Sequence, residues 1–148
     1  MSGRLNLNIS IFIRREFYGT LALMMFLILP VSVNAAPGWL TDLETKCNAG
    51  QADGCLSAGA AYLRGEYDSK KVAKDKRKAN MFIKDGLQQG ERNCKRNSLH
   101  DCYIIGVVYF EGHLTPADFS KGLQLLQKSC KGGYKEACIW LENSGIRM

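Results

Sequence analysis

Six cysteines are the side chains in this sequence best suited to chemistry, and they form three pairs. The members of each pair are eight residues apart: Cys47/Cys55, Cys94/Cys102 and Cys130/Cys138. An even number of cysteines at regular spacing predicts disulfides if the compartment is oxidising. Zinc is the alternative, because His100 lies between Cys94 and Cys102. That C-x5-H-x-C spacing is not a standard zinc motif, and the other pairs enclose no histidine. The cysteines therefore predict disulfides and no metal site.

Candidate nucleophiles and bases are few. There are two histidines, His100 and His113, each in or beside a predicted connection. A serine β-lactamase needs a lysine at the third position after its serine, together with S-D-N and K-T-G elements, and none of these is found. Ser57, Ser98, Ser120 and Ser129 are followed at that position by Ala60, Asp101, Leu123 and Gly132. No glycine-rich phosphate loop is followed by Lys-Ser or Lys-Thr. The sequence predicts no catalytic residue and no cofactor.

The N-terminus has the pattern of an export signal. Arginines in residues 1–20 precede the apolar run 21–33, and Val33-Asn34-Ala35 fits a small-x-small cleavage site. We expect a signal peptide over 1–35, cleavage after Ala35, and a periplasmic or secreted domain over 36–148. An uncleaved anchor is the alternative, but the run is shorter than the roughly 20 residues that span a bilayer. We therefore expect no stable membrane anchor after cleavage. Arg14-Arg15 also resembles a twin-arginine signal, although that route would require disulfides to form in the cytosol first.

The rest of the chain is organised as a repeat. Residues 102–112 (CYIIGVVYFEG) and 55–65 (CLSAGAAYLRG) share Cys, Gly, Tyr and Gly at offsets 0, 4, 7 and 10, and a shorter third copy begins at Cys138. Self-similarity at a period of roughly 20–50 residues is typical of a solenoid. We predict an all-α fold of αα-hairpins with repeats at about 55–94 and 102–130 and capping helices at about 39–48 and 135–143.

The boundaries of the second helices and the connections follow from apolar periodicity and turn residues. One helix is predicted over 79–89, and another from the cap Thr115 with Pro116 at its first position to about 131. No strand pattern is visible. The first repeat period exceeds the second, and we expect its additional residues in two connections, the basic stretch 66–78 and the polar stretch 90–100.

Repeat symmetry selects one disulfide pairing among the fifteen that six cysteines allow. Each predicted pair lies at the end of one helix and the start of the next, which an antiparallel turn brings within bonding range. The predicted bonds are Cys47–Cys55, Cys94–Cys102 and Cys130–Cys138. The loss of chain entropy in the unfolded state predicts that each of these disulfides, which close short loops, stabilises the fold by about 2.5 kcal/mol.

Conserved offsets between the copies predict structural roles. Gly59 and Gly106 lie within helices, where glycine costs about 1 kcal/mol relative to alanine, so we expect a close approach of the partner helix. The small residues predicted to face them are Ala79 and Gly122. Tyr62 and Tyr109 follow them by one turn, and Gly65 and Gly112 end the helices.

This pattern resembles the Sel-1-like repeat, a tetratricopeptide-related αα-hairpin. The resemblance rests on the shared offsets, on Asp75-x-x-Lys78-Ala79 and Asp118-x-x-Lys121-Gly122, and on the C-x7-C pairs of the cysteine-rich secreted branch, the Hcp type. It covers nearly all of residues 40–145. Departures are the long first repeat, Gly122 in place of Ala, and Glu142 where a third glycine would stand. The resemblance implies mainly protein binding, and it also implies an alternative, because some members are described as penicillin-binding or weak β-lactamases.

A second apolar stripe is the candidate partner-binding surface. It contains Tyr103, Val107 and Phe110 in the second copy, Leu56 and Leu63 in the first, and Ile139 in the third. The alternative is that these side chains are buried between neighbouring helices. The basic stretch Lys70–Lys78 could bind an anionic partner such as lipid head groups or nucleic acid. The favoured interpretation is a solvated loop and first helical turn, since no aromatic residue is interleaved with it and an exported protein rarely meets nucleic acid.

The sequence thus predicts an exported, non-catalytic module that binds a protein or peptide partner and no nucleic acid. Two alternatives stay open: an enzyme or binding protein for β-lactams, and an immunity or inhibitor protein for one toxin.

Overall fold

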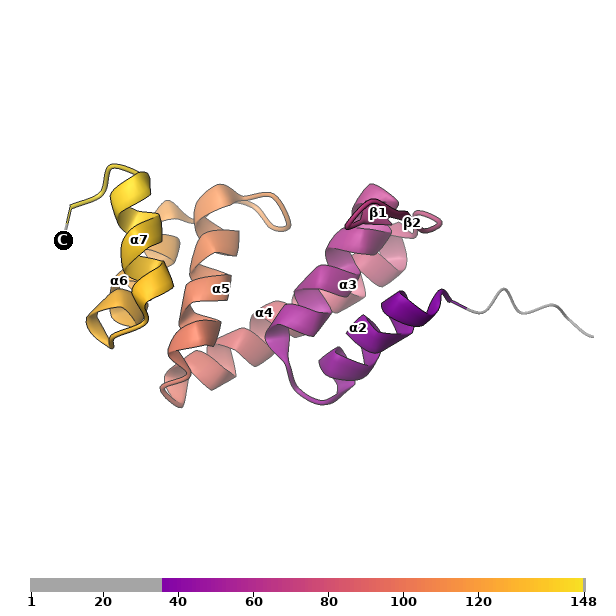
Figure 1. Ribbon diagram of the computed structural model, residues 1–148, viewed down its shortest axis with the longest axis horizontal. Helices are drawn as coiled ribbons and strands as arrows, with labels where there is room; N and C mark the ends of the chain where they lie inside the picture. The colour runs from indigo at the N-terminus through magenta and orange to yellow at the C-terminus, as the bar shows by residue number, and fades with distance from the viewer. Residues whose placement is uncertain (1–35, 148) are drawn as a thin grey trace, which may run out of the picture. The chain divides into compact units, whose positions relative to one another are not determined.

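A computed structural model describes residues 36–147, and Ala36–Met148 forms one compact unit (Figure 1). The predicted signal peptide, 1–35, lies outside the described residues. Within the described part, six helices and one small hairpin follow in the order α2 (Gly38–Asn48), α3 (Ala52–Arg64), β1 (Glu66–Tyr67), β2 (Lys70–Lys71), α4 (Lys76–Lys95), α5 (Leu99–Glu111), α6 (Phe119–Lys131) and α7 (Lys135–Asn143). None of these helices is long and apolar enough to cross a membrane.

The helices form two αα-hairpins with one additional helix at each end. The first repeat pairs α3 with α4 and the second pairs α5 with α6, while α2 packs on α3 and α7 packs on α6. Contacts between α4 and α5 join the two repeats, and the elements can be followed in this order in Figure 1. This arrangement confirms the predicted all-α solenoid stapled by disulfides.

Two apolar clusters form the core. The first joins α2 to the first repeat, and the second joins the first repeat to α5. The first contains Leu40, Cys47, Cys55, Ala58, Ala61, Tyr62, Ala79 and Phe82, and the second contains Leu56, Ile83, Leu87, Cys94, Cys102 and Ile105. The core therefore lies at the contacts between consecutive helices, as a solenoid requires.

The two repeats end and begin their helices in the same way. Gly65 and Gly112 have φ values of 80° and 72°, and their N–H groups donate to Ala61 O and Val108 O. Glycine adopts this left-handed conformation without steric cost, which ends α3 and α5 at equivalent positions. Asp75 and Asp118 then cap α4 and α6, each carboxylate accepting an N–H three residues later at 3.0 Å.

The structure corrects the predicted extent of α4. The stretch 90–100 was predicted to be a connection, but α4 continues to Lys95 and is 20 residues long, against 13 for α6. Buried Leu87, Gly90 and Cys94 continue one face of the helix at intervals of three and four residues. The polar residues between them lie on the solvent face of the helix. The stretch 90–100 therefore has the polar composition that is typical of a loop.

Two further predictions were wrong. The stretch 66–78 contains an antiparallel hairpin, in which Glu66 pairs with Lys71 and Tyr67 with Lys70, although no strand was expected. Its two-residue turn has positive φ at Asp68 and Ser69, the geometry that fits the twist of a hairpin. Helix α6 begins at Phe119 instead of Pro116, because the Asp118 carboxylate caps it and the Asp118 N–H donates to Tyr109 O at 2.8 Å.

Candidate functional site

The six cysteines form three disulfides, each joining the end of one helix to the start of the next. Cys47–Cys55 links α2 to α3, Cys94–Cys102 links α4 to α5, and Cys130–Cys138 links α6 to α7, with Cα–Cα distances of 4.4, 4.7 and 4.8 Å. No free thiol is left among these residues to bind zinc or attack a substrate. In residues 36–147 no group of three metal-ligating side chains comes together. Three structural disulfides are typical of a protein that folds in an oxidising compartment.

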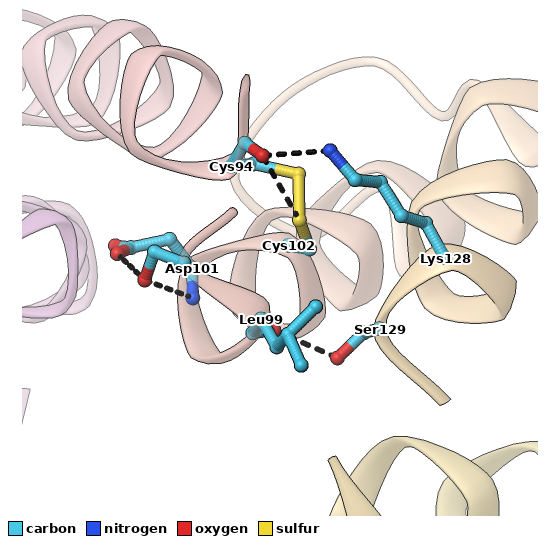
Figure 2. Close-up of a disulfide and its surroundings, with 7 residues drawn as sticks. Cys94, Leu99, Asp101, Cys102, Lys128 and Ser129 are labelled. Carbon is cyan, nitrogen blue, oxygen red and sulfur yellow. Dashed lines mark hydrogen bonds between the residues drawn. A yellow bond between two sulfur atoms is a disulfide. The ribbon is translucent and has the colours of Figure 1, made fainter. Parts of the chain in front are cut away.

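The surroundings of the central disulfide hold the two repeats together (Figure 2). Lys128 Nζ of α6 donates to Cys94 O at 2.7 Å, and Ser129 Oγ donates to Leu99 O at 2.7 Å. Ser129 is fully buried. Its hydroxyl hydrogen is therefore directed at a backbone carbonyl, an arrangement that stabilises the packing of α6 on α5.

The histidines lie at opposite ends of one helix. His100 is the second residue of α5, and His113 follows the C-cap Gly112, so the helix separates the two histidines by about 20 Å. The His100 and Tyr134 rings meet in edge-to-face geometry with centroids 5.8 Å apart, and His113 Nε2 lies 3.9 Å from Glu111 Oε2. Each histidine is exposed, and the length of the helix places the two too far apart to act together at one reacting centre.

The repeat glycines lie where helices approach each other closely. A Cβ on Gly59 would lie 2.6 Å from Ile83 Cγ1 and 3.2 Å from Ala79 O; on Gly106 it would lie 2.9 Å from Leu126 Cγ. Gly122 has the tightest surroundings, because a Cβ there would lie 2.6 Å from Phe110 N and 2.8 Å from Gly106 O. Backbone atoms cannot move aside as a side chain can, so glycine at 122 is what allows α6 to contact α5.

A polar network of Glu, Tyr and Lys occurs twice. The Tyr62 hydroxyl donates to Glu44 Oε1 at 2.6 Å and lies 3.2 Å from Lys78 Nζ. In the second network the Tyr109 hydroxyl donates to Glu91 Oε1 at 2.7 Å, and Lys121 Nζ both pairs with Glu91 and lies 3.9 Å from the centre of the Tyr109 ring. Each network joins three helices.

The networks shift the pKa values of their members in consistent directions. Hydrogen bonds from Lys121 and then Tyr109 lower the pKa of Glu91. Burial raises the pKa of Tyr62 and of Tyr109, and the neighbouring glutamate adds to each rise. Desolvation opposes the charge of Lys121, but its bonds to Glu91 and Tyr109 outweigh this and raise its pKa. These shifts favour a charged carboxylate, a neutral phenol and a charged amine, the states that make the network's bonds.

The residues predicted to bind a partner do not form one surface. Leu56 is 5% exposed within the second core cluster, so the prediction of an exposed binding residue was wrong there. Leu63 is half-buried and packs against both clusters. Tyr103, Val107 and Phe110 are half-buried, and Ile139 is 55% exposed. Leu56 of the first copy is buried because a whole repeat follows it, whereas in residues 36–147 only α7 follows the stripe of the second copy.

Aromatic contacts link α5 to the segments that follow it. The Phe110 ring lies 5.5 Å from Phe119 and 5.1 Å from Trp140 between centroids, in edge-to-face geometry. Phe119 is 62% exposed. We refer to Phe110, Phe119, Ile139 and Trp140 as the C-terminal apolar edge.

A groove lies between the first repeat and the end of α5. It has a volume of about 400 Å³, within the roughly 300–1,000 Å³ typical of ligand pockets. Ile83 and Leu87 form its apolar part, and Glu91 and Tyr109 of the second network also line it. Asn80, Lys84, Gln88 and Thr115 complete the lining. This groove could not be predicted from the sequence, because its walls come from separate helices.

Sequence reasoning also missed Glu44 and Glu91. Each stands three residues before the first cysteine of a pair, as E-x-x-C, and each lies 18 residues before its tyrosine. That shared offset is a signal that could have identified them. The third copy has Gln127 at the equivalent position, and no third network forms in residues 36–147.

No family model matches the sequence. No similar protein was found among curated proteins. Among solved structures, the chain is similar to a protective antigen from uropathogenic Escherichia coli that displays an SLR fold, with a TM-score of 0.45 and 20% sequence identity. The similarity covers 72% of this chain, and the chain spans 22% of the length of that antigen.

Proposed function

We propose that the protein is an exported, non-catalytic interaction module of the Sel-1-like type, in its cysteine-rich secreted branch, and that it binds a protein partner through the C-terminal apolar edge. The helical-hairpin repeat, the three disulfides and the export pattern of residues 1–35 support this proposal. Its compartment is the periplasm or the cell exterior.

The exposure of Ile139 carries the proposal. Leu56, at the equivalent position of the first copy, is buried against α5, and Tyr103 in the second contacts Tyr134 at the start of α7. Ile139 occupies this position in α7 and is 55% exposed. The structure describes no element after α7 that covers this residue. An apolar residue at the position that contacts the next repeat suits a partner that covers it, because an uncovered outer face of a solenoid is normally polar.

Capture with matched baits tests the proposal. Residues 36–148, oxidised, are compared with Ile139→Asp/Phe119→Asp and with Met81→Asp, which changes a 50%-exposed apolar residue on α4. We expect one partner to be retained by the wild-type and Met81→Asp baits and lost from the double variant and from a reduced, alkylated bait. If the Ile139→Asp/Phe119→Asp bait still retains the partner, the C-terminal apolar edge is not the binding surface.

Two parallel measurements separate the alternatives. Hydrolysis of a chromogenic cephalosporin by the wild-type protein would replace the binding function with a β-lactamase activity. A single, tight partner that is itself a toxin would narrow the module to an immunity protein.

A further inference from the structure

The β1–β2 hairpin and the start of α4 carry a concentrated positive charge that the proposed function does not use. Residues 66–78 contain six basic and three acidic side chains, a net charge of +3. All six basic residues, Lys70, Lys71, Lys74, Lys76, Arg77 and Lys78, are exposed. We refer to residues 66–78 as the basic hairpin.

Part of this charge has no local counterpart. Lys71 pairs with Glu66, Lys70 Nζ lies 3.6 Å from Asp68, and Lys78 belongs to the first Glu–Tyr–Lys network. Among the described residues, Lys74, Lys76 and Arg77 form no ion pair. These three are available to an anion from outside the chain.

The position of these charges at a helix N-terminus strengthens the argument. Lys76, Arg77 and Lys78 are the first three residues of α4, where the helix dipole is positive and acidic residues are favoured. The equivalent helix α6 has one basic residue, Lys121, in its first three positions. A bound anionic group would offset the unfavourable charge at the start of α4.

Two aromatic rings lie beside the basic hairpin. The Trp39 ring stacks on Tyr67 with centroids 6.1 Å apart and planes 12° apart, and Lys70 Nζ lies 6.0 Å from the Trp39 centroid. Tyr67 is 37% exposed. Tryptophan and tyrosine beside lysine are the combination found at the level of lipid head groups.

We propose that the basic hairpin binds the phosphate groups of anionic lipids at a membrane surface, without insertion across the bilayer. The charge is complementary to such a surface, and Trp39 and Tyr67 would lie at its polar boundary. In an exported protein a membrane leaflet is a more accessible polyanion than nucleic acid.

Vesicle sedimentation tests this proposal with residues 36–148, which form a compact unit of their own. Wild-type protein is mixed with vesicles of phosphatidylcholine alone and with vesicles that also contain phosphatidylglycerol, at low and high ionic strength. We expect binding only to the anionic vesicles, with loss at high ionic strength because exposed charges are screened.

The decisive variant is Lys74→Glu/Lys76→Glu/Arg77→Glu. Acidic residues at the start of α4 suit the helix dipole, so this variant should fold at least as well as the wild type. Each basic residue near an anionic surface contributes about fivefold in partitioning, so loss of the three positive charges alone should weaken binding about a hundredfold, and the three new negative charges should weaken it further. The matched control, Lys84→Glu/Lys95→Glu/Lys135→Glu, has the same net charge and should retain most of the binding.

Three results would overturn the proposal. They are equal binding to neutral and anionic vesicles, equal losses in the two triple variants, and absence of binding at low ionic strength. A single-stranded oligonucleotide that binds more tightly than the anionic vesicles would instead assign the basic hairpin to nucleic acid.

Discussion

The hydroxyl of Tyr109 donates to Glu91 Oε1 at 2.7 Å, and this contact connects the two repeats. Glu91 lies in α4 of the first repeat and Tyr109 in α5 of the second, while Lys121 of α6 closes the network. The equivalent contact of Tyr62 with Glu44 connects α2 to the first repeat. Hydrogen-bond networks therefore connect the successive repeats of the solenoid, in addition to its apolar core.

Removal of the Tyr109 hydroxyl should measure how much this hydrogen bond contributes to the stability of the fold. Tyr109→Phe keeps the ring in place and removes the hydrogen bond to Glu91, which should lower the free energy of unfolding by about 1 kcal/mol. Tyr62→Phe should have a similar effect. Urea denaturation of the oxidised variants measures both values, and unchanged midpoints would show that the networks add no stability.

Acid should weaken the same network. The pKa of Glu91 is lowered in the folded state, so its stabilising contribution is complete above the unfolded pKa of 4.5 and is lost as pH falls through the lower folded value. We expect the free energy of unfolding to fall below about pH 4.5. In Glu91→Gln this acid dependence should be shallower than in the wild type. Identical pH profiles from urea titrations of the two proteins would contradict the prediction.

Alkaline pH should lower the stability of the fold through Tyr109 and Lys121, the other two residues of this network. The pKa values of Tyr109 and Lys121 are both raised in the folded state, so the neutral phenol and the charged amine are favoured there. Stability should therefore be lost as pH rises past the ordinary values of 10.0 and 10.5. Tyr109→Phe/Lys121→Met should flatten this alkaline limb in thermal melts.

The central disulfide should contribute more to stability than the C-terminal one. Cys94 and Cys102 are 3% and 0% exposed between the two repeats, whereas Cys130 and Cys138 are half-buried beside the terminal helix. Loop entropy alone predicts about 2.5 kcal/mol for either bond. Replacing Cys94 and Cys102 with alanine should cost more than this, because the buried contact between repeats is also weakened. Replacing Cys130 and Cys138 should release mainly α7, and hydrogen exchange would locate the loss.

Alanine at Gly122 should be more damaging than alanine at Gly59. Both changes gain helix propensity, but all three nearest neighbours of a Cβ at 122 are backbone atoms of α5, at 2.6–2.9 Å. At 59 the shortest contact is with the Ile83 side chain, and the backbone atoms lie at 3.0 Å or more. We expect Gly122→Ala to lower the free energy of unfolding by about 1–3 kcal/mol. Gly38→Ala is the control, because a Cβ there has no neighbour within 4 Å. Equal stability of the Gly122 and Gly38 variants would contradict the close approach of α6 to α5.

The sequence by itself determined those features that depend on neighbours along the chain. The apolar periodicity of residues 102–111 predicted a helix, and Gly112 predicted its end, because a left-handed C-cap is a local requirement. The recurrence of this pattern predicted the hairpin repeat. The same symmetry predicted the cysteine pairs that the structure bonds, since the short turns between helices leave little choice of partner.

Only the tertiary structure decided which surfaces are covered and which polar side chains meet. Leu56 and Ile139 occupy equivalent positions, yet one is buried and the other exposed, because within residues 36–147 a complete repeat follows only the first. Glu91 and Tyr109 meet because α4 continues to Lys95 and α5 packs against it. Burial and side-chain pairing between separate helices depend on packing across the whole chain, and one helix's local sequence does not contain that information.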